Sequence, residues 1–345
     1  MRKQIGVVLA VLLYYSGLTG LARWWMQRSG PRLIILNYHR ATGGDLRHHL
    51  LYLRRHYHVL HLEEALEEFY DLCNGGKQGR DRRTLLALTF DDGYYDNYTH
   101  AFTLACELQF PITIFLIPGY IGSGDDFWWL EGERLVCRAQ VDEVTIEGHT
   151  YHLPQKEERD RLARAIDTRL RHASSVAERE ASLLEMREAL AVSSSKVEVG
   201  ERAIRPLTWE EVHKMEESGW VSFGGHTMHH PILAYLTDPA EVKYEVRECR
   251  RVLEQRLGHP VRIFAYPVGR PEHIGETLQA VREAGYTWAV TTVNGINAPQ
   301  SDPHLLRRVL GDVSRHWLVM AAETSSIWKF FSRLWKNPVF GFDES

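Results

Sequence analysis

From residue 33 onward, short apolar runs alternate with longer amphipathic segments. The run LIILNY at 33–38 is continuously apolar, which is typical of a strand buried on both faces of a parallel sheet. The segment at 46–57 has the spacing of an amphipathic helix, and 62–72 repeats that pattern. A helix at 208–219 begins at a threonine that can cap it and ends at a glycine. The further predicted strands are 58–60, 85–90, 112–117, 220–224, 262–267, 287–292 and 305–310, and the further predicted helices are 98–108, 239–258 and about 273–284.

Roughly eight strands that alternate with helices indicate an α/β fold with a parallel sheet and helices outside it. The sheet is either a closed (β/α) barrel or a doubly wound open sheet. In barrels of this kind the chemistry lies at the carboxyl ends of the strands.

The alternation stops between residues 118 and 206. This stretch holds FWWLEGERL at 127–135 and a highly charged helical segment at 155–175. It is too long for a simple loop, so we predict a helical insertion at about 120–205 within one βα connection. It is either a solvated appendage or a lid in which Trp128 and Trp129 stack on sugar rings.

Polar side chains with catalytic potential follow four of the predicted strands. His39 follows 33–38, Asp91-Asp92-Gly93 follows 85–90, and the histidine-rich sequence at 226–231 follows 220–224. Val268-Gly269 comes after the strand at 262–267. Each motif alone is a common surface loop or turn, but together they place two carboxylates and several imidazoles at one edge of the sheet.

Two of these histidines and one aspartate form a plausible metal-ligand set. His226 and His230 are four residues apart, so one helical turn would point both imidazoles the same way. With Asp92 as the third ligand, positions stay open for water and substrate. The neighbouring Asp91 is then left as a general base, since two adjacent carboxylates do not comfortably share one role. We predict that His229 lies behind the metal ligands and does not bind the metal itself.

Three motifs resemble those of the polysaccharide deacetylases, the NodB-homology group of carbohydrate esterases. Thr89 to Gly93 matches the TFDDG motif, His226 to His230 resembles the H-[S/T]-x-x-H motif, and Phe264 to Gly269 resembles the third, proline-containing motif. The resemblance covers about residues 33–120 and 206–310 and implies a (β/α) barrel-like fold with one divalent ion, for which zinc is expected.

The resemblance also implies individual roles. Asp91 is the base, Asp92, His226 and His230 hold the metal, the N–H of Val268 helps the oxyanion, and Tyr266 and Pro267 lie beside the substrate acetyl group. The implied reaction is hydrolysis of N-acetyl groups on an N-acetylhexosamine-containing polysaccharide. The alternatives are a deacetylase of a lipid-linked sugar or other non-peptide amide, and a non-catalytic glycan-binding relative.

The family's last motif, L-x-x-H, supplies a general-acid histidine and is missing near the C-terminus. Leu36 to His39 fits it instead, which resembles the circularly permuted branch that includes poly-β-1,6-N-acetylglucosamine deacetylases. His39 is therefore the expected acid. The arginine that orients the base in many members is replaced by Ala265, and Arg40 or Arg270 is the expected substitute. Trp288 is a candidate for the tryptophan of the acetyl pocket.

Composition adds little to this interpretation. The formal net charge of −4 gives no reason to expect a nucleic-acid partner, and the four cysteines form no CxxC motif. The 18 histidines make chance pairs at ligand spacing common, so the histidine pair alone proves little.

The ends of the chain indicate a membrane. The run from Ile5 to Ala22 is apolar, and Trp24 and Trp25 follow it as interface anchors would. We predict an anchor in residues 1–30, with a cleaved signal peptide as the alternative, a catalytic domain at 31–320 that lies outside the cytoplasm, and an amphipathic tail at 321–345 that either meets the membrane or docks on the barrel.

Overall fold

Seven parallel strands close into a barrel in the computed structural model, which describes residues 2–77, 79, 81–192 and 204–327. Each strand pairs in parallel with its neighbours, and β3 pairs with β1 to complete the ring. The predicted barrel is therefore confirmed, and the doubly wound alternative is excluded. Around the ring the strands are β1 (Leu33–Tyr38), β10 (Leu306–Leu310), β9 (Trp288–Asn294), β8 (Ile263–Ala265), β7 (Val221–Gly225), β4 (Ile112–Leu116) and β3 (Leu85–Phe90). The short strand β2 (His58–Val59) pairs with the start of β3.

Alternate residues of the strands point into the barrel and away from it. One buried cluster joins residues of six strands to the apolar face of α4 (Leu62–Cys73), and we identify it as the barrel interior. Its strand members are Leu33, Ile35, Leu85, Ala87, Phe115, Ile263, Ala265, Trp288, Val290 and Leu306. Because Thr89 and Asp91 continue the alternation of Leu85 and Ala87, the inward face of β3 becomes polar where the strand ends.

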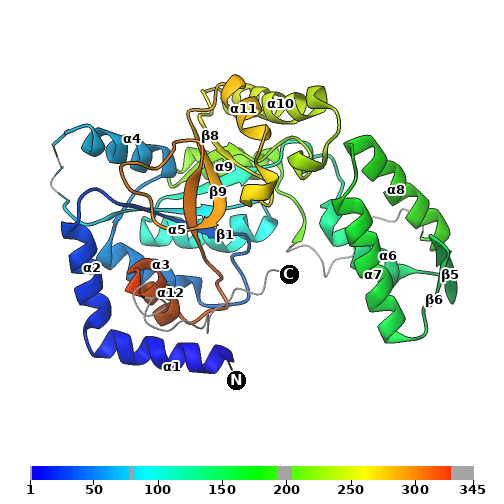
Figure 1. The fold of residues 1–345 in the computed structure, drawn as a ribbon, viewed down its shortest axis with the longest axis horizontal. Coiled ribbons are helices and arrows are strands. Elements are labelled where there is room, and N and C mark those ends of the chain that lie inside the picture. The colour runs from blue at the N-terminus through cyan, green and yellow to red at the C-terminus, as the bar shows by residue number, and fades with distance from the viewer. Residues whose placement is uncertain (1, 78, 80, 193–203, 328–345) are drawn as a thin grey trace.

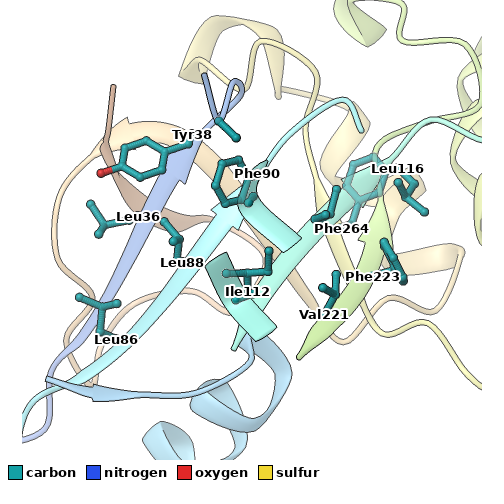
Figure 2. Close-up of a cluster of buried hydrophobic side chains, with 14 of the residues drawn as sticks. Leu36, Tyr38, Leu86, Leu88, Phe90, Ile112, Leu116, Val221, Phe223 and Phe264 are labelled. Carbon is teal, nitrogen blue, oxygen red and sulfur yellow. The ribbon is translucent and has the colours of Figure 1, made fainter. Parts of the chain in front are cut away.

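The intervening residues belong to a second, larger cluster that lies under the outer helices. Figure 2 shows part of it, with side chains of β1, β3, β4, β7 and β8 side by side. The helices over this face include α3 (Leu46–His56), α5 (Thr103–Leu108), α9 (Trp209–Glu217), α10 (Pro239–Leu257), α11 (Thr277–Glu283) and α12 (Trp317–Thr324).

The predicted elements are found with small shifts of their ends. The predicted helix at 98–108 differs most, since it begins as a π-helix, η1 (Asn97–Phe102), and continues as α5. The helix α9 is capped, as predicted, by Thr208, whose hydroxyl accepts from the Glu211 N–H in a capping box.

The insertion between β4 and β7 has its own buried cluster and lies to one side of the barrel (Figure 1). It contains η2 (Trp128–Leu130), α6 (Glu131–Arg138), α7 (Lys156–Arg171) and α8 (Val176–Ala189). It is not purely helical, because β5 (Glu143–Ile146) and β6 (His149–His152) form an antiparallel hairpin.

Two helices precede the barrel, α1 (Arg2–Tyr15) and α2 (Leu18–Arg28). Among the described residues no single helix is long and apolar enough to cross a membrane, although these two would pass together as a pair bent by 72°. Most of the predicted C-terminal tail lies outside the described residues. Its first residues belong to α12 (Trp317–Thr324), which begins within the predicted catalytic domain and packs on α1.

Candidate metal centre and active site

Loops at the carboxyl ends of β1, β3, β7 and β8 converge on one site. The site loops are unusually strained, because four of the eight non-glycine residues with positive φ in the described part of the chain lie there: Asp92, Thr227, His230 and Val268. Such backbone conformations persist only where the surroundings over-determine them, and they cluster at functional sites.

Asp92, His226 and His230 form the one candidate metal cluster among the described residues, with ligand atoms within 4.8 Å of one another. The Nε2 atoms of His226 and His230 lie 3.4 Å and 3.6 Å from Asp92 Oδ1. That oxygen is buried and has no hydrogen-bond partner within the described structure. A divalent cation would satisfy it, so the three residues fit the ion that the sequence predicted.

Hydrogen bonds, burial and charge set the state of the three candidate ligands. Burial would lower the pKa of His226, but Asp92 and Asp91 outweigh it and raise that pKa. His226 donates from Nδ1 to the carbonyl oxygen of Ala265 at 2.7 Å, which leaves Nε2 free to bind. Burial would raise the pKa of Asp92, but the surrounding histidines outweigh it and hold that pKa well below its usual range. Burial and the neighbouring His226 lower the pKa of His230 to about 3, so its ring is neutral.

Asp91 is held by an arginine that the sequence analysis missed. Arg308 of β10 is fully buried inside the barrel and forms two bonds to Asp91, from Nη1 to Oδ1 at 2.7 Å and from Nη2 to Oδ2 at 2.8 Å. Its Nε donates to the Thr291 carbonyl oxygen. Burial would raise the pKa of Asp91, but Arg308 outweighs it and lowers that pKa, so Asp91 is ionised.

Arg308 therefore takes the place that the sequence analysis assigned to Arg40 or Arg270. Arg40 instead donates to the buried carboxylate of Asp96 at 2.9 Å, and Arg270 precedes a short helix, η5 (Pro271–His273). Arg308 could have been suspected as a charged residue within an apolar strand, but its neighbour Arg307 is an equally polar candidate.

His39 lies on the other side of Asp91, at the end of β1. Its Nε2 is 4.0 Å from Asp91 Oδ2, and its side chain is 52% exposed, so it can meet both Asp91 and solvent. The loop that carries it is fixed by Asp96, which accepts from the N–H groups of Ala41 and Thr42, and by Asn97, which donates to the His39 carbonyl oxygen at 3.0 Å. Neither Asp96 nor Asn97 was singled out from the sequence.

His229 is turned away from the cluster, in keeping with its predicted place behind the ligands. Its Nδ1 lies 2.7 Å from Glu245 Oε1, and its N–H donates to Glu245 Oε2 at 2.8 Å. Glu245 belongs to α10 and is almost fully buried. This carboxylate thereby anchors the loop between the two metal-ligand candidates.

Residues of the insertion also contact the loop that carries His229 and His230. The Trp128 Nε1 donates to the His230 carbonyl oxygen at 3.1 Å, and Arg179 Nη1 donates to the His229 carbonyl oxygen at 3.0 Å. Trp128 is buried, so it cannot stack on a sugar as the lid hypothesis required. The ring centroid of Trp129 lies 4.4 Å from that of His230, which makes Trp129 a wall of the site.

The loop after β8 matches its predicted position but not every predicted role. Val268 has φ of 59°, and its carbonyl oxygen accepts from Thr292 Oγ1 at 2.6 Å. Tyr266 is buried and its hydroxyl donates to the His304 carbonyl oxygen, so its side chain is not placed to meet a substrate. Pro267 follows in the same loop. Trp288 opens β9 in the barrel interior, away from the carboxyl ends of the strands, and is not an acetyl-pocket residue.

The fold and the motifs define a class of protein. The sequence model of the polysaccharide deacetylase family matches residues 78–191 and 182–289, which is more than half of the chain. The chain belongs to the polysaccharide deacetylase family.

Among individual relatives, the Bacillus subtilis deacetylase homologue YxkH is 32% identical over 103 residues. That alignment spans 30% of this chain and 36% of YxkH, about a third of the relative's length.

Solved structures share the barrel. IcaB from Ammonifex degensii aligns with a TM-score of 0.52 at 20% identity, over 86% of this chain and 98% of IcaB. The deacetylase PplD of Streptococcus pyogenes, solved in complex with acetate, aligns with a TM-score of 0.51 at 19% identity, over 84% and 97% of the two chains. At these identities the likeness establishes the fold alone.

Proposed function

We propose that this protein removes N-acetyl groups from an N-acetylhexosamine-containing polysaccharide by hydrolysis, with a divalent ion held by Asp92, His226 and His230. The observation that carries the proposal is the buried, unpartnered Asp92 Oδ1, which faces both imidazole Nε2 atoms. Two nitrogen ligands and one carboxylate favour zinc.

We assign the remaining steps to residues around this cluster. When bound, the ion would polarise the amide carbonyl and bring the pKa of a water ligand to about 7. Asp91, kept ionised by Arg308, accepts the proton of the attacking water. The Val268 N–H stabilises the oxyanion, and His39 protonates the leaving amine. The products are acetate and a free amino sugar.

Acetate release tests this proposal. The purified chain is treated with a chelator, reloaded with one divalent metal at a time, and incubated with chitin-type, peptidoglycan-type and β-1,6-linked N-acetylglucosamine oligomers. We expect release of acetate from at least one oligomer, only after a metal is restored. No release from any oligomer with any metal, under conditions where the protein is folded, contradicts the proposal.

Two variants separate the metal site from the base. His226→Ala removes a ligand and should lower bound metal and activity together. Asp91→Asn removes the base but no ligand, so it should keep the metal and lose about 10²–10⁴-fold in kcat. Wild-type metal content in His226→Ala, or near-normal turnover in Asp91→Asn, would show that the roles are misassigned.

A further inference from the structure

The two N-terminal helices dock on the barrel through one face only. Leu13 of α1 packs against Ala322 and Ile327, and the ring centroid of Tyr14 lies 5.2 Å from that of Trp317. From α2, Arg23 Nη1 donates to the hydroxyl of Tyr52 at 2.8 Å. Figure 1 shows both helices at the periphery of the molecule, beside α3 and α12.

The other face of these helices exposes apolar side chains. Seven of the ten large hydrophobic residues exposed in the described part of the chain lie on α1 and α2, namely Val8, Leu12, Tyr15, Leu18, Leu21, Trp24 and Trp25. Val8, Leu12 and Tyr15 follow the i, i+4, i+7 spacing of one helical stripe, and so does the set of Leu18, Leu21 and Trp25 at i, i+3, i+7. Trp25 is 69% exposed and Leu12 is 61% exposed.

Charge identifies what would cover this face. Residues 1–32 contain five basic residues and no acidic one: Arg2, Lys3, Arg23, Arg28 and Arg32. The rest of the chain has 41 − 5 = 36 basic and 45 acidic residues, a formal charge of −9. An apolar face within a basic segment, with exposed tryptophans beside it, fits the interface of an anionic bilayer.

The geometry argues against a single spanning helix. The 14 residues of α1 span about 21 Å, which is less than the hydrocarbon core of about 30 Å. The helices are separated by Gly17, whose φ of 80° suits the bend of 72° between them. Straightening the pair into one rod would pull Leu13 from Ala322 or Arg23 from Tyr52.

We propose that α1 and α2 form an in-plane membrane-binding surface, which holds the barrel against an anionic lipid bilayer while both helices stay docked on it. This surface is independent of the proposed hydrolysis. It replaces the expected spanning anchor by a peripheral attachment, in which the exposed stripes enter the lipid interface and Arg28 and Arg32 meet the headgroups.

Vesicle flotation of the full chain tests the proposal. We expect binding to vesicles that contain phosphatidylglycerol, weaker binding to phosphatidylcholine alone, and release by alkaline carbonate. The triple variant Leu12→Gln, Leu21→Gln, Trp25→Gln should lose at least tenfold in partitioning. The matched control Leu184→Gln, Tyr244→Gln changes exposed apolar residues of α8 and α10 and should bind as wild type.

Charge is tested separately. Arg28→Gln with Arg32→Gln should weaken binding to anionic vesicles by about tenfold or more and leave the weak binding to neutral vesicles unchanged. Unchanged circular dichroism and thermal unfolding show that each variant is folded.

Four results would overturn the inference. Equal flotation of the triple variant and wild type would remove the apolar face from membrane binding, and equal loss in the matched control would show only non-specific adhesion. Resistance of the cell-bound protein to carbonate would indicate a spanning helix, and an intact mass that lacks the first helices would indicate a cleaved signal peptide.

Discussion

Replacing Arg308 by methionine should raise the pKa of Asp91 and destabilise the barrel. Asp91 is 2% exposed and Arg308 is fully buried, and the two bonds of 2.7 Å and 2.8 Å join them. Methionine fills much of the same volume but carries no charge. The variant therefore leaves a buried carboxylate without its counter-ion.

Two costs follow from this geometry. Breaking a buried ion pair by removing one partner typically costs about 3–5 kcal/mol, a large part of the 5–15 kcal/mol that usually stabilises a protein. Arg308 also lowers the pKa of the buried Asp91, so its loss should raise that pKa and move the acid limb of kcat/KM to higher pH. The acid limb moves upward because Arg308 favours the ionised form of Asp91 in the wild-type protein.

Urea unfolding and a pH profile of acetate release measure the two effects. Arg307→Met is the matched control, since Arg307 is exposed in the same strand, and it should change neither quantity. The double variant Asp91→Asn, Arg308→Met should be more stable than Arg308→Met alone, because a neutral amide replaces the unpaired buried charge. If Arg308→Met keeps the wild-type unfolding free energy and acid limb, Arg308 does not hold the base.

Three further predictions concern two residues beside the site and one mostly buried glutamate of α12. Trp128→Phe keeps an aromatic side chain but loses the hydrogen bond to the His230 carbonyl oxygen. Metal affinity, measured by chelator competition, should therefore fall about tenfold. An unchanged affinity would show that the insertion does not support the metal site. His39→Gln should lower kcat by about 10²–10⁴-fold without loss of bound metal, because His39 lies beside Asp91 and outside the ligand cluster. Full activity of this variant would remove His39 from the mechanism. Burial raises the pKa of Glu323 from 4.5 to about 7, so folding favours its protonated form and wild-type stability should fall by about 3 kcal/mol relative to Glu323→Gln as the pH rises from 4.5 to 8. If urea unfolding gives the same difference in unfolding free energy between the two proteins at every pH in this range, the assignment is wrong.

The arrangement of the barrel and the metal cluster could be predicted because both depend on local signals. Continuous apolar runs mark strands buried on both faces, and the structure places strands at 33–38 and 85–90 as expected. Parallel strands bring their carboxyl ends to one edge, so motifs far apart in sequence were expected to meet. Asp92, His226 and His230 do meet within 4.8 Å.

The contacts that position these residues could not be predicted, because they depend on register and on packing between distant segments. The sequence LLRRVL offers two adjacent arginines, and strand alternation requires only that they face opposite ways. Which one enters the barrel depends on the pairing of β10 with β9, whose register shifts between Leu306 and Arg308. Likewise, Trp128 has the composition of a sugar platform, and only its bond to the His230 carbonyl shows that it supports the loop.

Ring closure explains why the acid candidate, His39, and the arginine that holds the base, Arg308, come from opposite ends of the catalytic domain. Strand β1 pairs with β10 on one side and β3 on the other, through Leu36 with Val309 and Leu36 with Leu88. This places His39 and Arg308 on either side of Asp91, although Arg308 is 217 residues away in sequence. The base therefore obtains its counter-ion only once the last strand has closed the barrel, and Asp91 in an open barrel would be a carboxylate without that arginine. The pairing of β1 with β3 aligns His39 with Asp91, so the proposed acid–base pair depends on the pairing of two strands rather than on either motif alone.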